Sequence, residues 1–287
     1  MIWERRVSWF VCVAATVAAC TIPAGAVIYS ELGNTSVAFW IWDPASGSPR
    51  APVSNPDICL QAGDDVDALS LGDDYDQFGV GRVDAFIVDQ SAVGSRGDLL
   101  TRSAAGMPVE RDVYRDDDTT GNRLQIPDLI SQSMGGGAAD GAIDGFDFGL
   151  PRQGDRIYFS LAPGSPSLGM LYSPGDILTC QFRVPGSLTV YVRAILIGNP
   201  PDIDALSIFD AQRDTTFNPG TDYVIYSTRT PGDGYIYHYG LGSPGTPPPP
   251  PVAHEHSIFG LLNTDNVLGL EHFRDPQADA DDWSLYE

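Results

Sequence analysis

The sequence predicts an all-β protein, a propeller-like ring of about four four-stranded repeat units that the N- and C-terminal strands close. Three observations support this fold. A short Asp-bearing segment occurs four times, Gly and Pro interrupt short runs rich in Val, Ile, Tyr and Phe, and helical periodicity is almost absent. A two-sheet β-sandwich with the same number of strands is the alternative.

The repeated segment is clearest at residues 201–209, Pro-Asp-Ile-Asp-Ala-Leu-Ser-Ile-Phe. The other copies lie at residues 65–71, 142–148 and 266–273. Equivalent positions 67, 144, 204 and 268 are separated by 77, 60 and 64 residues. One repeat of this size rarely buries its own apolar surface, so we expect the copies to pack against one another.

Each unit continues with further strands. A second run begins with Asp and often closes with Ser, at residues 84–91, 155–160, 222–227 and 282–286. A third and a fourth run follow in most units, which gives about four strands per unit. One position of the repeat is always small (Ala68, Gly145, Ala205 and Gly269). Such a position is typical of a crowded inner strand near an axis.

The two ends of the sequence predict closure. Residues 27–30 and 224–227 are both Val-Ile-Tyr-Ser, yet no full unit precedes the first of them. The last unit stops at Glu287. We therefore expect the N-terminal strands to complete the sheet that the last unit begins, which removes two exposed sheet edges.

Residues 1–26 are predicted to be an export signal, because two arginines precede an apolar run that is too short to span a bilayer. Ala24-Gly25-Ala26 predicts cleavage before Val27, which leaves one domain at residues 27–287. The alternative is a lipobox that ends at Cys20, which would anchor the protein as a lipoprotein. The protein is thus predicted to be secreted, periplasmic or at the cell surface, with no transmembrane span.

Two cysteines, Cys59 and Cys180, lie beyond the export segment. They precede two copies of the repeat at related positions. In an oxidising compartment they would form a disulfide. Two separate buried thiols that pack as small apolar side chains are the alternative.

The charge excludes some partners. The net charge is −22, with 38 acids against 16 bases, and the bases are all arginine. Such a surface repels nucleic acid and anionic membranes. An extracellular protein or a carbohydrate is the kind of ligand that remains. The many Asp residues form either a solubilising surface or sites for divalent cations, and calcium is the cofactor that they predict.

Paired carboxylates supply the candidate calcium ligands. Two Asp residues two positions apart on a strand point to the same side and can share one cation. One acidic loop opens like a calcium loop, but lacks the acid expected at its twelfth position. The candidate ligands are Asp65, Asp67, Asp116, Asp118, Asp202 and Asp204. The alternative for the repeated pairs is that each Asp caps a tight turn by accepting backbone N–H groups.

The remaining motifs are weaker indications of a functional site. His254 and His256 flank one residue and form either a transition-metal pair or an exposed polar loop. The proline tract at residues 246–251 cannot join a sheet ladder and is predicted to be a protruding polyproline loop. No motif of a nucleophile elbow, a zinc protease or a phosphate-binding loop is present.

The unit made of residues 143–146, 156–160 and 174–178 resembles repeats of secreted bacterial proteins with an Ile-Asp-Ala-Leu, Leu-Phe-Ser and Glu-Asp-Ile-Leu pattern. The resemblance covers most of residues 60–240, and Leu268 replaces the motif Asp in the last unit. It implies export and a β-repeat fold, and no particular activity. The leading hypothesis is a secreted binding or cell-surface structural protein, stabilised by calcium. The alternative is a secreted hydrolase or lyase of the carbohydrate-active type, with Asp carboxylates at one end of the ring.

Overall fold

The structure is a computed structural model that describes a subset of the residues. They are mostly β-strands in antiparallel sheets, so the prediction of an all-β protein is confirmed. At some strand positions, Asp67 among them, the backbone alone is described. The described residues are 27–31, 37–43, 48–49, 53–54, 60–64, 66–70, 85–88, 92, 94, 113–115, 123–126, 143–147, 156–165, 168–169, 171–181, 184, 186–210, 214–228, 235–240, 250–255 and 267–272.

Three sheets are antiparallel meanders of four strands that follow one another in the chain. We name each sheet by its first strand. The β5 sheet holds β5 (Val66–Ser70), β6 (Ala85–Val88), β7 (Val113–Arg115) and β8 (Arg123–Ile126). The β9 sheet holds β9 (Ile143–Asp147), β10 (Arg156–Leu161), β11 (Ile177–Gln181) and β12 (Thr189–Val192). The β13 sheet holds β13 (Ala205–Phe209), β14 (Tyr223–Ser227), β15 (Tyr235–Tyr239) and β16 (Val252–Glu255). The 3-10 helix η5 (Ala194–Ile197) lies between β12 and β13.

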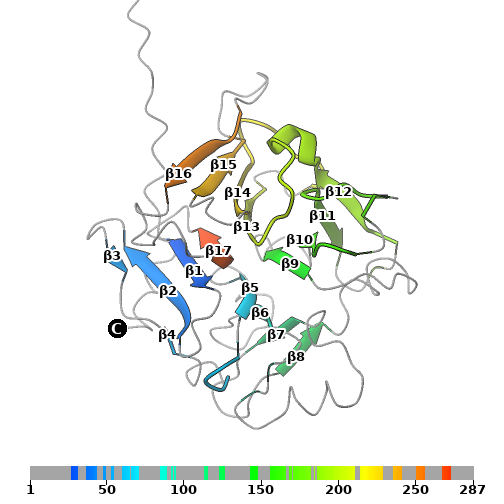
Figure 1. Cartoon of the computed structure of the whole chain (residues 1–287). Coiled ribbons are helices and arrows are strands. Elements are labelled where there is room, and N and C mark those ends of the chain that lie inside the picture. Colours follow the sequence, from blue (N-terminus) through cyan, green and yellow to red (C-terminus); the bar gives the residue numbers. More distant parts are fainter. Residues whose placement is uncertain are drawn as a thin grey trace, which may run out of the picture.

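The fourth sheet, the β17 sheet, combines strands from both ends of the described chain. Its order is β17 (Val267–His272), β1 (Val27–Glu31), β2 (Val37–Asp43) and β3 (Ser48–Pro49), and β4 (Val53–Ser54) also pairs with β2. β1 runs antiparallel to β17, and Figure 1 shows the two strands side by side. The predicted pairing of the N-terminal strand with the last unit is therefore present.

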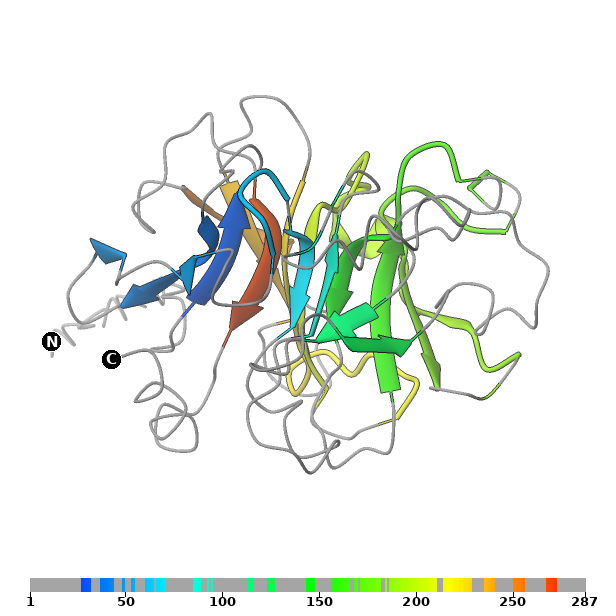
Figure 2. The same cartoon turned by 90° about the horizontal axis from the view of Figure 1, so that it is seen from below.

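The four copies of the Asp-bearing segment supply the four first strands. β17 contacts β5, β5 contacts β9, β9 contacts β13, and β13 contacts β17. Figure 1 shows these strands near the middle of the molecule, with β3, β8, β12 and β16 toward its outside. Seen from below in Figure 2, the sheets stand next to one another. The repeat thus places equivalent strands against each other, as expected.

Apolar clusters fill the space between neighbouring sheets. One joins the β5 and β9 sheets through Ala68, Ile87, Phe146 and Phe159. A second joins the β9 and β13 sheets, and a third the β13 and β17 sheets. Because a sheet between two others is covered on both faces, every residue of β10 is buried. Each large side chain buried in this way contributes roughly 1.5–3 kcal/mol.

Neighbouring atoms explain why the repeat holds a small residue at Gly145. A Cβ there would lie 2.8 Å from Ser160 Oγ and 3.0 Å from Leu206 Cβ, on two different sheets. The equivalent Ala68 and Ala205 are fully buried. A larger side chain at Gly145 would push β9 away from the β13 sheet.

In three of the four second strands (β1, β10 and β14), a serine at or next to the end of the strand joins neighbouring sheets. The hydroxyl donates to a backbone carbonyl at or just before the start of the next sheet's first strand. The three bonds are Ser30 Oγ to Val66 O (3.0 Å), Ser160 Oγ to Ile203 O (2.9 Å) and Ser227 Oγ to Val267 O (2.8 Å). The sequence showed this recurring Ser, and the structure shows its role.

Candidate functional site

Five buried side chains between the β9 and β13 sheets form the densest described meeting of carboxylates and hydroxyls. We call them the carboxylate–tyrosine cluster, and each is at most 5% exposed. Asp147 ends β9, Tyr158 lies on β10 and Tyr191 on β12, while Asp210 and Asp222 flank β13 and β14. Alternation along β10 directs Tyr158 toward the β13 sheet and its neighbours Ile157 and Phe159 toward the β5 sheet. The members are Asp147, Tyr158, Tyr191, Asp210 and Asp222.

The two tyrosines donate to two of the carboxylates. Tyr158 Oη lies 2.8 Å from Asp210 Oδ2, and Tyr191 Oη lies 3.3 Å from Asp222 Oδ2. The two rings meet edge to face, with centroids 4.8 Å apart. Both bonds cross from the β9 sheet to the β13 sheet, so they fix how these sheets face one another.

Asp147 connects three of the first strands. It lies on β9 and accepts hydrogen bonds from Ser70 Oγ on β5 (3.0 Å) and from the Ile208 backbone N–H on β13 (2.5 Å). It occupies the repeat position that holds Ser70 and Ser207 in two other copies. A carboxylate accepts more bonds than a hydroxyl, so this copy can bind two neighbours at once.

Burial and charge hold both phenols in the neutral form. Burial raises the pKa of Tyr158 well above its ordinary value, the adjacent Asp210 carboxylate adds to this, and Arg156 opposes it. Burial also raises the pKa of Tyr191, with smaller contributions from Tyr158, Asp210 and Asp222. Both side chains therefore carry their proton and donate hydrogen bonds at neutral pH.

The cluster suits the joining of sheets better than chemistry on a substrate. Its carboxylates accept bonds from phenols, a serine hydroxyl and backbone amides, and it is closed to solvent. A buried carboxylate that loses one such donor costs about 1–3 kcal/mol. The arrangement thus specifies which residues of neighbouring sheets lie opposite one another.

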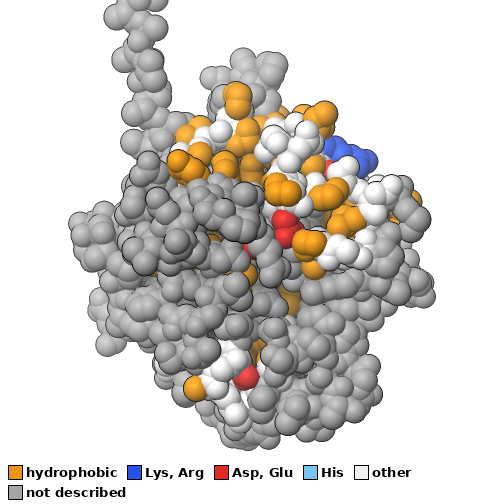
Figure 3. All heavy atoms as spheres, in the orientation of Figure 1, with side chains coloured by type: hydrophobic (Ala, Val, Ile, Leu, Met, Phe, Trp, Pro, Cys, Tyr) orange, Lys and Arg blue, Asp and Glu red, His pale blue; other side chains and the backbone are white. Residues whose placement is uncertain are grey.

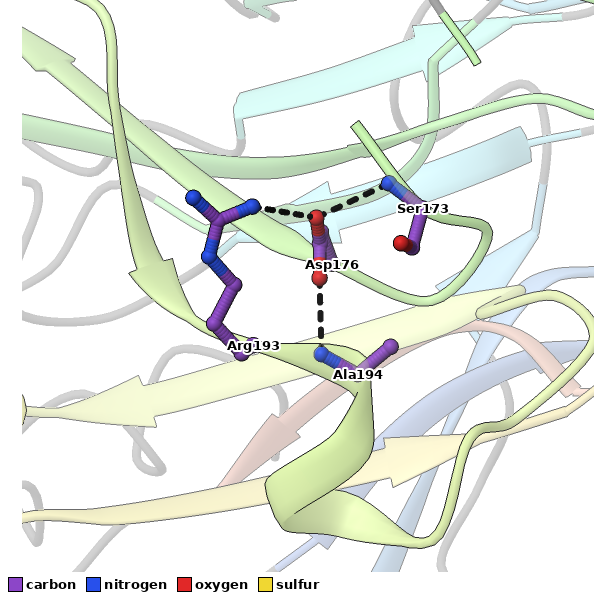
Figure 4. Close-up of polar contacts among 4 residues, drawn as sticks. All are labelled: Ser173, Asp176, Arg193 and Ala194. Atoms are coloured by element: carbon purple, nitrogen blue, oxygen red, sulfur yellow. Dashed lines mark hydrogen bonds and ion pairs between the residues drawn. The ribbon is translucent and has the colours of Figure 1, made fainter. Parts of the chain in front are cut away.

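Three carboxylates, Asp222 of the cluster and two others, close tight turns before strands. Asp64 Oδ2 accepts the Gln61 N–H (2.9 Å), and Asp222 Oδ2 accepts the Asn218 N–H (2.7 Å). Asp176 Oδ2 accepts the Ser173 N–H (2.9 Å) and an Arg193 guanidinium N–H (3.1 Å), while Oδ1 accepts the Ala194 N–H (2.7 Å), as Figure 4 shows. A glycine with positive φ precedes each Asp within two positions, as a type II turn requires.

These turns show the structural use of Asp at positions other than those predicted from the sequence. The turn-capping alternative concerned Asp65, Asp67, Asp202 and Asp204. The described turn is made by Asp64, and Asp65 lies outside the described residues. The signal that identifies such residues is a Gly-Asp or Pro-Gly-x-Asp sequence directly before a strand. Asp147 and Asp210 have no such local signal, because their partners lie far away in the chain.

The candidate calcium ligands are described in part. Asp202 and Asp204 are buried just before β13, and the Asp204 N–H donates to Ser227 O (3.2 Å). Asp67 lies in β5, but its side chain is outside the described residues, as are Asp65, Asp116 and Asp118 altogether. Within the described part of the chain, no three His, Cys, Asp or Glu side chains form a group that could hold a metal ion.

The remaining sequence motifs are also described in part. Cys180 is buried in the cluster between the β5 and β9 sheets, but Cys59 lies outside the described residues, so their disulfide stays a prediction. The His254 side chain and all of His256 are likewise outside them. Of the proline tract, the last two residues are described, and Pro250 is exposed.

The described surface includes an apolar projection on η5. Ile195 is 73% exposed and Leu196 is 50% exposed. The preceding Arg193, with a side chain 56% exposed, bonds to Asp176, which ties this region to the turn before β11. Figure 3 shows apolar side chains on the face turned to the viewer, with arginine beside them. Exposed apolar groups of this kind are typical of contact surfaces.

Comparison with known proteins adds no identity. No family model matches the chain, and no curated protein is significantly similar to it. The resemblance to secreted bacterial repeats therefore stays a prediction. Among the described residues, no helix has the length and apolar character needed to cross a membrane.

Proposed function

We propose that the four sheets are the blades of a propeller-like ring that β1 closes by pairing with β17. Four sheets rather than two favour the ring over a sandwich. The contacts among the first strands return from β17 to β5, and the serine bonds repeat between successive sheets. Three equivalent bonds indicate that neighbouring sheets meet in the same geometry, as blades do.

We further propose that the protein is a secreted, acidic binding or structural protein of the cell surface, with an extracellular protein or a carbohydrate as its ligand. The observation that carries this proposal is the carboxylate–tyrosine cluster. Its carboxylates and phenols are buried and bonded to one another and to backbone, so the cluster contributes to rigidity. A rigid scaffold is what a binding surface such as η5 requires.

A binding and turnover comparison tests this role. Residues 27–287 would be incubated with a panel of soluble polysaccharides, and both gel retardation and release of reducing ends would be measured. The proposal predicts retardation by at least one polysaccharide without release. Release of reducing ends by the folded chain that is absent from a heat-denatured control would instead support the hydrolase alternative.

Export and calcium are separate parts of the proposal. Cleavage before Val27 predicts a mature chain that begins Val-Ile-Tyr, whereas lipidation predicts a mature chain that begins at a modified Cys20; intact mass distinguishes them. Calcium binding at Asp116 and Asp118 predicts a melting temperature that rises with calcium and falls in chelator. Asp116→Asn with Asp118→Asn should remove that rise, and a melting temperature independent of calcium would refute this part.

A further inference from the structure

We infer that Tyr235 and Tyr237 on β15 form a binding site for an arginine side chain of an extracellular protein ligand. The inference rests on the binding role proposed above and specifies the chemistry of the ligand. The two tyrosines flank the buried Ile236, so they share the opposite face of the strand. Tyr237 is half-buried against the apolar cluster between the β9 and β13 sheets, while Tyr235 is 38% exposed. The pair therefore extends that cluster to the surface of the protein.

The two rings continue a row of tyrosines that begins in the core. Tyr226 is buried, and its hydroxyl donates to the Ile197 carbonyl at the end of η5 (2.8 Å). The Tyr237 ring stacks on the Tyr226 ring, with centroids 5.2 Å apart and planes 16° apart. The Tyr235 ring follows, with its centroid 6.3 Å from that of Tyr237 and its plane tilted by 50°. The exposed end of the row is therefore supported from the core, which reduces the entropy that is lost when a ligand binds.

The outer side of Tyr237 is bordered by a small residue. Its register partners are Tyr226 on β14 and Ala253 on β16. Residues that lie directly opposite each other share a face of the sheet. Tyr226 therefore covers one side of the Tyr237 ring, and the exposed Ala253 flanks the other. A larger side chain at position 253 would shield this ring, whereas alanine leaves room for a flat group beside the tyrosines.

Charge complementarity indicates a cation as the ligand. The face of an aromatic ring carries negative potential and attracts a cation within about 6 Å of the ring centroid. The net charge of −22 raises the concentration of cations near the protein. Glu255 is the register partner of Tyr235, and the strands β14, β15 and β16 contain no arginine of their own. These strands thus supply aromatic rings and an acidic residue, and a ligand would supply the cation.

The exposed rings favour arginine over lysine. A guanidinium group is flat and weakly hydrated, so it stacks on an aromatic ring and still donates hydrogen bonds from its edge. An ammonium group is more strongly hydrated, so it loses more when it leaves water. Two rings tilted by 50° offer a guanidinium one face for stacking and a second ring close by. The site should therefore distinguish two ligands that carry the same charge.

Two peptides of equal charge test the site. Fluorescein-labelled peptides of alternating Gly and Arg, or of alternating Gly and Lys, would be titrated with residues 27–287 at physiological salt and followed by fluorescence anisotropy. The wild type should bind the Arg peptide more tightly than the Lys peptide. Tyr235→Leu keeps the net charge but removes one exposed ring, so it should weaken binding of the Arg peptide about three- to fivefold. Tyr235→Phe keeps the ring and should bind nearly as the wild type does.

Two further variants separate the rings from the general acidic surface. Tyr172→Leu removes a half-buried tyrosine between β10 and β11 at constant charge, and it should leave peptide binding unchanged. Ala253→Leu leaves both tyrosines in place but shields the Tyr237 ring, so it should weaken binding of the Arg peptide. The melting temperature of each variant checks that the chain is folded.

Failure of the inference can be told from failure of the proposed binding role. If Tyr235→Leu binds the Arg peptide as tightly as the wild type, or if the wild type binds both peptides equally, the general acidic charge accounts for binding and the site is refuted. A wild type that retains a polysaccharide of the panel above but binds neither peptide also refutes the site, and the binding role stands. If the wild type binds neither the peptides nor any polysaccharide, both fail.

Discussion

The two faces of the β9 sheet solve the same packing problem in different ways. Toward the β5 sheet, Ile157 and Phe159 enter an apolar cluster. Toward the β13 sheet, Tyr158 of the same strand enters a cluster that contains Tyr191, Tyr226 and Tyr239. Both faces contain apolar contacts. The face toward the β5 sheet has the bond from Ser70 Oγ to Asp147, and the face toward the β13 sheet has the bonds from tyrosines to Asp210 and Asp222.

The difference shows what each kind of contact specifies. Apolar contact is strong but non-directional, so at the β5–β9 interface it stabilises the packing while the bond from Ser70 Oγ to Asp147 adds direction. The tyrosine–carboxylate bonds add less net free energy, but misplacing them leaves charge buried without partners. We therefore expect the first interface to dominate stability and the second to dominate the choice of neighbour.

The largest effect is expected for Phe159→Ala on the apolar face. Removing a fully buried aromatic side chain there should lower the free energy of unfolding by about 3–5 kcal/mol, measured by urea denaturation. Phe159→Leu keeps most of the volume and should cost clearly less. Equal losses for the two variants would show that this face is not closely packed.

Tyr158→Phe, one position away, isolates the polar face. The ring remains, but Asp210 loses the hydroxyl donor at 2.8 Å, so the expected loss is about 1–3 kcal/mol. A double-mutant cycle with Asp210→Asn should show coupling between the two positions. Additive losses would mean that the bond contributes nothing.

Alkaline pH should also affect the polar face more than the apolar one. Folding raises the pKa values of Tyr158 and Tyr191 above their ordinary value of 10.0. The free energy of unfolding that these raised pKa values contribute is complete below that pH. It is lost as pH rises, by about 1.4 kcal/mol per pH unit for each tyrosine. Urea denaturation between pH 9 and 11 should show a steeper decline for the wild type than for Tyr158→Phe with Tyr191→Phe. Parallel declines would contradict the assignment.

The serine bonds between sheets should give the smallest and most uniform effect. Ser30→Ala and Ser227→Ala each remove one buried bond and should each cost about 1 kcal/mol. Ser187→Ala, in a solvent-exposed turn, is the matched control and should cost less. A loss at Ser227 without one at Ser30 would show that the β1 joint differs from the continuous sheets.

Much of the fold could be predicted because each copy of the repeat is a short, continuous stretch of sequence. Val-Ile-Tyr-Ser occurs at residues 27–30 and 224–227, and the strands that carry it, β1 and β14, occupy the second position of their sheets. One position of the repeat always holds Ala or Gly, which likewise predicted that the first strands lie close to their neighbours. The atoms that surround Gly145 explain why no larger side chain fits there. These features depend on neighbours in sequence, or on one position repeated in every copy.

The site could not be predicted in the same way. Asp147 and Ser70 are 77 positions apart, and Tyr158 and Asp210 are 52 apart, so no local pattern relates them. With 32 Asp residues in the chain, composition does not distinguish the ones that meet. The turn carboxylates have a local signal, because a glycine precedes each of them within two positions, as at Gly63-Asp64.

Hydrogen exchange at the β1–β17 ladder tests the central claim most directly. If β1 closes a ring, the amides of residues 28–30 and 268–270 should exchange together and as slowly as those of β13 and β14, within about tenfold. Exchange of residues 28–30 at the rate of an unprotected peptide, with β13 and β14 still protected, would show that the ring is open at this joint.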